Sequence, residues 1–419
     1  MRILNVTASY APFLEFGGPP VKVRSLSEGL ARQGHSVTVL TADWGIDARL
    51  RDASGQVAAE RSPFGWRREE NGVQAIYLPT WLRRRALSWN PAAKRYCRAR
   101  LQNFDVAHIF GLYDLLGPAV AGECRAKGLP YVVEPIGMFL PIVRNILLKR
   151  MYHAMLGRRL LWGASAVIAT SEQEAEELAG GGVRREKIVL RRNGVERPSK
   201  WPESGAFRRA NGISPGAKLV LFLGRLSVKK SPELLLKAVA DLPTQLQERE
   251  LKLVYAGPDE GGVRKQLAQM TSRLGMQKRV YFSGPIYGDT KWAAYRDADV
   301  FVLPSQNENF GNSAAEAVAA GTPVIVTEQC GIAPLLADQA GLVVAHDASS
   351  ISGALARVLS EPGLRERLAA GCSAVAARLG WEEPVQEMES LYARVAAQRD
   401  AESDAESDSK NNFELGAGD

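Results

Sequence analysis

The chain has 419 residues, of which 46% are hydrophobic and 24% are charged, and its formal net charge at pH 7 is +7. This composition is that of a soluble globular protein, and the length exceeds what one hydrophobic core usually supports, so two domains are expected. No apolar run reaches the roughly 18–20 residues of a membrane span, and the first residues, MRILNVTASY, predict a strand and not a secretory signal. The four cysteines lack the spacing of a metal site or a disulfide framework, which predicts a reduced, cytoplasmic setting.

The charge is unevenly distributed along the chain. Residues 1–200 hold 30 basic and 18 acidic residues, a net of +12, whereas residues 201–399 hold 22 and 21, a net of +1. The basic half could meet anionic lipid or a polyphosphate-linked acceptor, or it could be a solvated arginine-rich face. No nucleic-acid motif accompanies it, so no nucleic-acid partner is expected. Residues 400–419, a repeated Ala-Glu-Ser-Asp run with a net charge of −6, are expected to be an acidic disordered tail.

Strands and helices alternate along the first part of the chain. Strands are predicted at 3–7, 36–41, 73–78, 106–110, 131–134, 166–170 and 188–190, and helices at 21–33, 117–127, 143–161 and 172–179. A turn at Asn193-Gly194 and a polar connector at 196–204 follow. Beyond it, strands are predicted at 219–223, 252–256, 280–283, 300–304, 323–327 and 342–344, and helices at 232–240, 263–274, 350–359, 364–379 and 385–398. Two such alternations predict two doubly wound α/β domains, 1–197 and 198–380.

Two carboxylates eight residues apart, Glu308 and Glu316, lie in a predicted strand–loop–helix–strand unit. A turn at 310–312 separates them. Ligands of open α/β sheets bind beyond the carboxyl ends of the strands, where Glu308 falls, and the start of the following helix favours a phosphate. The pattern therefore predicts one carboxylate placed for a sugar hydroxyl and another for a different part of the same ligand. The alternative is two solvated helix charges.

Arg225 and Lys230 follow another apolar strand, which ends at Gly224. Cations at a strand end suit a nucleotide diphosphate, because an arginine fork pairs with two oxygens and a lysine supplies a mobile point charge. Lys229 competes with Lys230 for the second role. A surface basic loop without a ligand is the alternative.

These segments resemble the retaining glycosyltransferases with the GT-B fold, in particular glycosyltransferase family 4 (group 1 glycosyltransferases). Their E-x7-E region reads approximately E-x-F-G, a few residues, and E-A-x-A-x-G-x-P-V-I. The matching residues here are Glu308, Phe310, Gly311, Glu316, Ala317, Ala319, Gly321, Pro323, Val324 and Ile325. Arg225 and Lys230 match the family's G-R-x-x-x-x-K segment, and the resemblance extends from Met1 to about Arg399.

The resemblance implies two Rossmann-like domains facing across a cleft, with a C-terminal helix at about 381–399 packing back on the first. Glu316 would hold the ribose hydroxyls and Glu308 the donor sugar, and Arg225 and Lys230 would neutralise the diphosphate. Further donor-binding positions are the backbone N–H groups of Phe310, Gly311 and Asn312, together with Asn193. No cofactor is implied beyond the donor itself, a UDP-, GDP- or ADP-sugar.

The glycine pair Gly17-Gly18 resembles the family's N-terminal glycine loop. Paired glycines let a backbone come close to a ligand and leave its N–H groups exposed. In this position the pair is expected to approach the donor phosphate or sugar. Glu15 and Phe16, in the same loop, are candidates for contact with the acceptor.

Residues 105–111 resemble the family's D-x-x-H-x-H-G strand, with Phe110 in place of the second histidine. His108 is accordingly a candidate for a catalytic contact, and a buried structural histidine is the alternative. Many relatives have a histidine or arginine where this chain has Ile136. Glu134 is a possible polar substitute for it.

Asp297-Ala-Asp299 has the form of an Asp-x-Asp metal motif, but it lies just before a strand and away from any phosphate loop. We therefore expect no metal site there. No G-x-G-x-x-G sequence follows the first strand, which argues against a dinucleotide-dependent dehydrogenase.

The combined prediction is a metal-independent, retaining hexosyltransferase that uses a lipid-linked or polysaccharide acceptor. Alternatives are a synthase or phosphorylase acting on a soluble sugar, and a non-catalytic sugar-nucleotide-binding subunit. The segment 143–161 has apolar residues at near-helical spacing with Lys149 and Arg150 among them, a pattern typical of peripheral contact with anionic lipid at the inner face of the plasma membrane. The alternative is that this apolar face packs into the core.

Overall fold

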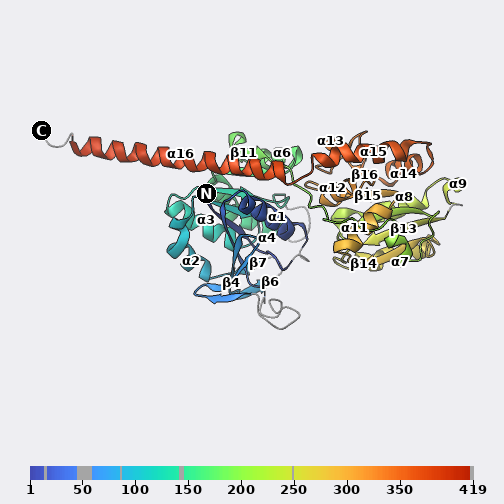
Figure 1. Cartoon of the computed structure of the whole chain (residues 1–419), viewed down its shortest axis with the longest axis horizontal. Helices are drawn as coiled ribbons and strands as arrows, with labels where there is room; N and C mark the ends of the chain where they lie inside the picture. The colour runs from blue at the N-terminus through green and yellow to red at the C-terminus, as the bar shows by residue number, and fades with distance from the viewer. Residues whose placement is uncertain (14–16, 45–58, 85–86, 141–145, 248–249, 416–419) are drawn as a thin grey trace. The chain divides into compact units, whose positions relative to one another are not determined.

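The computed structural model describes residues 1–13, 17–44, 59–84, 87–140, 146–247 and 250–415 (Figure 1). The chain divides into two compact units, one formed by Met1–Arg192 with Trp381–Asp419 and the other by Asn193–Gly380. The first boundary thus lies five residues before the expected 197/198. Glu15 and Phe16, the candidates for acceptor contact, lie outside the described residues.

The first unit is built on a nine-stranded sheet with the order β11-β10-β9-β8-β1-β2-β5-β4-β3. Strands from β11 to β5 run parallel, and β4 and β3 join antiparallel at one edge. Their bounds are β1 (Arg2–Thr7), β2 (Ser36–Ala42), β3 (Glu60–Ser62), β4 (Gly65–Glu70), β5 (Val73–Leu78), β8 (Val106–Phe110), β9 (Tyr131–Glu134), β10 (Ala166–Ala169) and β11 (Ile188–Leu190). A separate hairpin pairs β6 (Leu82–Arg84) with β7 (Leu87–Trp89). The strands β3, β4, β6 and β7 were not predicted from the sequence.

Helices cover both faces of this sheet, and consecutive residues of its central strands are accordingly buried. Ile3 of β1 contributes to the core beneath α1 (Gly18–Arg32) and α16 (Glu382–Leu415), whereas Leu4 contributes to the core on the other face. That second core includes residues of α2 (Ala92–Arg100) and α3 (Leu116–Ala126). The remaining helical segments are η3 (Leu101–Asn103), α4 (Ile146–Tyr152), η4 (His153–Gly157), α5 (Arg158–Trp162), α6 (Glu172–Gly180) and η5 (Arg185–Lys187).

Helix α16 begins directly after the chain returns to the first unit (Figure 1). Val385, Met388, Leu391, Tyr392 and Val395 are buried at helical spacing in the core that α1 also contributes to. The helix continues to Leu415, so the expected disorder of the acidic tail differs from the structure over 400–415. Alanine and glutamate are good helix formers, and neither glycine nor proline interrupts this run, which explains how the backbone continues the helix.

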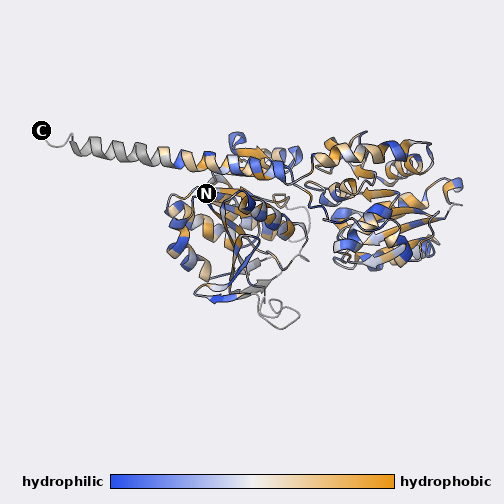
Figure 2. Cartoon of the chain, viewed as in Figure 1, coloured by the Kyte–Doolittle hydropathy of each residue, from blue (hydrophilic) through white to orange (hydrophobic). Residues whose placement is uncertain are grey.

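The second unit has a six-stranded parallel sheet with the order β14-β13-β12-β15-β16-β17. Its strands are β12 (Lys218–Leu223), β13 (Leu251–Ala256), β14 (Val280–Gly284), β15 (Val300–Leu303), β16 (Val324–Thr327) and β17 (Gly341–Val344). Its helices are α7 (Ala206–Ala210), η6 (Val228–Lys230), α8 (Pro232–Ala240), α9 (Thr244–Gln247), α10 (Val263–Arg273), α11 (Gly288–Asp297), α12 (Asn312–Ala319), α13 (Ala333–Leu336), α14 (Ala348–Ser360) and α15 (Leu364–Ala377). Leu219 and Val220 point into cores on opposite faces, and apolar residues are concentrated on the strands of this unit (Figure 2). Two doubly wound parallel-sheet domains are therefore confirmed.

The predicted helix 143–161 differs from the structure in two ways. It is divided into α4, a π-helical turn at η4 and α5, and its first residues, 143–145, lie outside the described part. Its N-terminal apolar residues do not enter the core, since Leu147 is 74% exposed and Met155 is 69% exposed, whereas Leu160 and Leu161 are buried. The apolar residues of this segment are thus divided between solvent and core. Among the described residues, no helix is long and apolar enough to cross a membrane.

Candidate active site

The carboxyl ends of two adjacent parallel strands of the second unit, β12 and β15, bring together the two motifs identified in the sequence. Lys230, in the loop after β12, places its Nζ 2.6 Å from Oε2 of Glu308, in the loop after β15. Both side chains are mostly buried. Residues 78 positions apart thus share one buried ion pair at the predicted edge of the sheet.

The Glu308 loop is held by backbone hydrogen bonds to the loop that follows β16. Glu308 N donates to the carbonyl of Gln329 at 2.9 Å, and its own carbonyl accepts from Gly331 N at 2.9 Å. Gly311 then takes a positive φ of 100° as the N-cap of α12. A Cβ there would lie 3.0 Å from the Ile332 side chain, so both the conformation and the space require glycine.

Positive charge around Glu308 controls its ionisation. Burial by itself raises the pKa of the Glu308 carboxyl, but the charge and hydrogen bond of Lys230, with Lys229 and Arg225 adding smaller contributions, lower that pKa overall. Glu308 is therefore a carboxylate at neutral pH. Arg225 is exposed and forms a 3.2 Å ion pair with Glu260, so its guanidinium lies where a soluble anion can reach it.

Glu316 lies on α12 and is held by two donors that were not predicted from the sequence. Nζ of Lys291 lies 2.8 Å from Oε1, and the hydroxyl of Tyr295 donates to Oε2 at 3.0 Å. Both donors come from α11, four residues apart, and hence from one face of that helix. The i, i+4 spacing was visible in the sequence, but nothing in it linked α11 to α12.

The start of α12 has polar groups that lack a hydrogen-bond partner among the described residues. Asn193 donates through Nδ2 to Oδ1 of Asn312 at 3.0 Å, while its own buried Oδ1 has no such partner. The buried Oγ of Ser313 is in the same situation. The structure thus joins Asn193 to the predicted phosphate end of the site, although the two segments are far apart in sequence.

In the first unit, Gly17 and Gly18 form the start of α1. Gly17 is its N-cap with φ at 97°, and the helix begins at Gly18 with Pro19 and Pro20 in its first turn. The pair is at least partly exposed and lies beyond the carboxyl end of β1. The predicted approach of this pair to the donor stays a prediction.

His108 is not accessible to a substrate, so the predicted catalytic contact of this residue is wrong. Its side chain is fully buried, Nδ1 lies 2.6 Å from the Tyr392 hydroxyl of α16, and its ring stacks on Phe110 at 3.8 Å. Burial, with the charges of Arg191 and Lys22 nearby, lowers the pKa of His108 well below its usual value, so it is neutral. Residue 108 points to the sheet face that α16 covers, and this explains the burial.

Glu134, at the end of β9, was a possible substitute for the histidine or arginine that many relatives have in place of Ile136. It is not accessible to a substrate either. Its carboxylate is fully buried, with Lys22 on one oxygen and Arg191 at 2.5 Å from the other. The next residues form a strained turn in which Ile136 has φ at 56°, a costly conformation for a β-branched side chain. Buried Glu174 holds this turn by accepting from Gly137 N at 2.7 Å and from Thr170 N at 2.8 Å.

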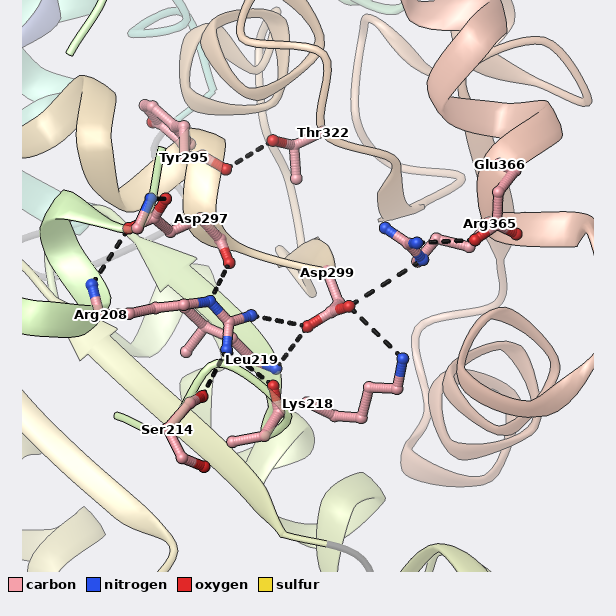
Figure 3. Close-up of polar contacts among 12 residues, drawn as sticks. Arg208, Ser214, Lys218, Leu219, Tyr295, Asp297, Asp299, Thr322, Arg365 and Glu366 are labelled. Atoms are coloured by element: carbon pink, nitrogen blue, oxygen red, sulfur yellow. Dashed lines mark hydrogen bonds and ion pairs between the residues drawn. The ribbon is translucent and has the colours of Figure 1, made fainter. Parts of the chain in front are cut away.

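The two aspartates of the Asp-x-Asp sequence have structural partners (Figure 3). Asp297 accepts hydrogen bonds from the backbone N–H groups of residues 205, 207 and 208 at the start of α7, at 2.6–3.0 Å. Asp299 pairs with Arg208 at 2.9 Å and accepts from Leu219 N at 2.9 Å, with Lys218 and Arg365 nearby. Across the described residues, no group of three or more His, Cys, Asp or Glu side chains is arranged to hold a metal ion.

Comparison with known proteins relates both units to one family. Residues 17–194 match the glycosyl transferase 4-like domain, and residues 203–371 match the glycosyl transferases group 1. An uncharacterised glycosyltransferase of Methanocaldococcus jannaschii is 29% identical over 406 residues, which cover 94% of this chain and 98% of that protein. A D-inositol 3-phosphate glycosyltransferase of Corynebacterium urealyticum is 35% identical over 417 residues, covering 94% of this chain and 95% of the relative.

Several other D-inositol 3-phosphate glycosyltransferases match over only 54% to 61% of their own length. Among solved structures, Anabaena Alr3699/HepE in complex with UDP and glucose superposes with a TM-score of 0.73 at 17% identity, covering 94% of this chain and 100% of that one.

Proposed function

The chain belongs to the group 1 glycosyltransferases and has the GT-B fold, and we propose that it transfers a hexose-type sugar from a nucleoside-diphosphate sugar with retention of anomeric configuration. The contact between Lys230 and Glu308 is the observation that carries this proposal, because it brings the proposed phosphate-binding cation next to the carboxylate proposed to bind the sugar hydroxyls. A nucleotide-sugar donor is also supported by Alr3699/HepE, which binds UDP and glucose.

In this proposal the donor lies along the sheet edge of the second unit. Arg225 and Lys230 offset the diphosphate charge, and the N–H groups at Phe310, Gly311 and Asn312 meet the distal phosphate. Glu308 accepts hydrogen bonds from hydroxyls of the donor sugar, and Glu316 from those of the ribose. Lys230 would then be shared between Glu308 and the leaving phosphate, which couples the position of the sugar to the neutralisation of charge.

Retention follows if the acceptor attacks the same face that the phosphate leaves. The bond from the anomeric carbon to the phosphate oxygen breaks, the bond to the acceptor oxygen forms, and the acceptor proton passes to the departing phosphate. Negative charge grows on that phosphate in the transition state, so the two cations stabilise it more than the bound donor. We propose that these cations make a metal ion unnecessary.

A lipid-linked or polysaccharide acceptor is our first proposal for the second substrate, with the enzyme working in the cytoplasm at the inner face of the plasma membrane. The exposed apolar residues of α4 and η4 lie among Lys149 and Arg150, and this combination suits an anionic membrane surface. A groove of about 470 Å³ lies beside them. Its lining combines apolar side chains, Leu156 and Leu160 among them, with the cations Lys94, Arg125 and Arg159.

A second candidate is transfer to a small phosphorylated polyol in solution. The name of the Corynebacterium urealyticum relative, a D-inositol 3-phosphate glycosyltransferase at 35% identity, favours it. The two candidates share the donor site and differ only in the acceptor.

The test begins with a thermal-shift panel of UDP-, GDP- and ADP-sugars, because a ligand that binds the folded state raises Tm. Each stabilising donor is then incubated with a polyprenyl-phosphate-linked sugar or with inositol phosphate, and NMR reads the anomeric configuration of the product. Donor binding followed by a retained linkage supports the proposal. Donor binding without turnover on any acceptor, or hydrolysis of the donor, favours a non-catalytic sugar-nucleotide-binding protein, and an inverted product excludes the retaining mechanism.

A further inference from the structure

The carboxylate of Glu316 is fixed from one side by two donors of different kinds. The ammonium of Lys291 lies 2.8 Å from Oε1, and the phenol of Tyr295 lies 3.0 Å from Oε2. Each carboxylate oxygen can accept two hydrogen bonds. Each oxygen of Glu316 therefore retains acceptor capacity on the side away from α11.

The two donors are themselves rigidly placed. Tyr295 is fully buried, and its ring packs against Phe301 and Trp292 with centroids 5.6 Å and 6.0 Å apart. Burial, and next the negative charge of Glu316, raise the pKa of Tyr295 well above its usual value, so the phenol stays protonated and can only donate to the carboxylate. The ammonium of Lys291 lies 4.7 Å from the centroid of the Trp292 ring, which restricts its position.

Glu316 and Lys291 are nonetheless reachable from solvent, since their side chains are 23% and 22% exposed. A fully buried and fully paired carboxylate would serve only to stabilise the fold. In Glu316, Lys291 and Tyr295 hold one side of the carboxylate, and the exposed side is open to a ligand.

We propose that Lys291 and Tyr295 are positioning residues that orient Glu316 for bidentate recognition of a ribose diol and so set the selectivity of the enzyme for ribonucleotides over 2′-deoxyribonucleotides. This inference rests on the proposed role of Glu316 at the ribose. With one donor on each oxygen, the carboxylate plane is fixed and its two outward acceptor sites match two adjacent hydroxyls. A 2′-deoxyribose cannot donate to one of these outward acceptor sites, and the loss of a hydrogen bond to a charged group weakens binding.

The Lys291–Glu316 pair could instead serve stability alone. Partly exposed ion pairs of this kind usually contribute little to stability. A merely stabilising pair would change Tm on mutation but would leave the ratio of the two nucleotide affinities unchanged. The ratio therefore separates the two roles.

The experiment measures Kd by calorimetry for UDP, GDP and ADP and for their 2′-deoxy forms with the full chain. We expect the wild-type protein to bind its preferred ribonucleotide at least about tenfold more tightly than the deoxy form. Lys291→Met and Tyr295→Phe should each reduce this ratio to about threefold or less, mainly by weakening the ribonucleotide. Lys291→Arg, which keeps a charged donor, should retain most of it.

Lys265→Met on α10 is the matched control, because Lys265 is exposed and lies on a different helix. It should leave the ratio at the wild-type value.

If both Lys291→Met and Tyr295→Phe bind nucleotide with an unchanged ratio, or the wild-type protein binds the two nucleotide forms equally well, the inference is wrong. Absence of any nucleotide binding by the wild-type protein would instead overturn the proposed donor site. Tyr295→Phe preserves the buried ring, and Lys291→Met changes a partly exposed side chain, so each provides a test if the other fails to fold.

Discussion

Lys230, whose ammonium contacts Glu308, lies in the same segment after β12 as Arg225 and Lys229, and single substitutions separate the functions of these residues. We expect Arg225→Ala and Lys230→Ala each to lower kcat/KM by roughly 10²–10³-fold, the range for removing one donor that stabilises transition-state charge. Lys229→Ala should have a much smaller effect. Steady-state kinetics with the identified donor provides the measurement, and a larger loss in Lys229→Ala would reassign the phosphate-binding cation.

The two glutamates differ in their partners, and this predicts different kinetics. Glu316→Ala should weaken binding of the free nucleoside diphosphate, because Glu316 is proposed to hold the ribose. Glu308→Ala should leave that binding nearly unchanged and lower turnover, since Glu308 is proposed to contact the sugar. Calorimetric Kd values beside kcat test this, and equal losses of nucleotide affinity in both variants would contradict the assignment.

At the scale of elements, α16 is a structural part of the first unit through side chains at helical spacing. Met388 is fully buried against the face of the sheet that carries His108. Met388→Ala should therefore destabilise the protein by about 2–5 kcal/mol, the usual cost of such a truncation in a core. Denaturant unfolding measures the change, with the exposed Arg394→Ala on the same helix as control. Equal, small effects of both substitutions would show that α16 does not pack as described.

The exposed apolar helix α4 makes a prediction about membranes. Vesicles containing phosphatidylglycerol should bind the protein at low salt and release it at high salt, because each basic residue near an anionic surface contributes about 1 kcal/mol. Lys149→Glu with Arg150→Glu should weaken this binding, and so should Leu147→Ser with Met155→Ser. The matched control is Lys265→Glu with Arg273→Glu on α10, both exposed. Flotation that does not depend on lipid charge would exclude the proposed attachment.

At the scale of the whole molecule, the proposed chemistry relies on side-chain cations and not on a bound ion. Transfer should therefore continue in the presence of EDTA at close to the untreated rate. The assay needs the full chain and the identified donor, followed by addition of manganese or magnesium. Complete loss of activity with EDTA and recovery with either metal would show that the enzyme requires a divalent cation.

The sequence by itself determined the architecture and one edge of the site. Short, nearly continuous apolar runs identify strands that are buried on both faces, and they predicted seven strands of the nine-stranded sheet and all six strands of the other. The edge strands β3 and β4 were not predicted. Glu308 and Lys230 each follow a predicted strand, and the carboxyl ends of parallel strands lie at one edge of a sheet, but their ion pair itself was not predicted. The roles assigned to these residues through family resemblance stay predictions.

Only the tertiary structure decided which element covers each face. For His108 the sequence left a catalytic contact and a buried structural role open. The structure has the buried one, because α16, which begins at residue 382, covers the side to which His108 points and supplies Tyr392. The partners of Glu316 were invisible because Lys291 and Tyr295 lie on another helix, 25 and 21 residues away. The apolar pattern of 143–161 gave no sign of its π turn, nor that Met155 is exposed whereas Leu161 is buried. Periodicity along a chain identifies an apolar face, but long-range packing determines what that face contacts.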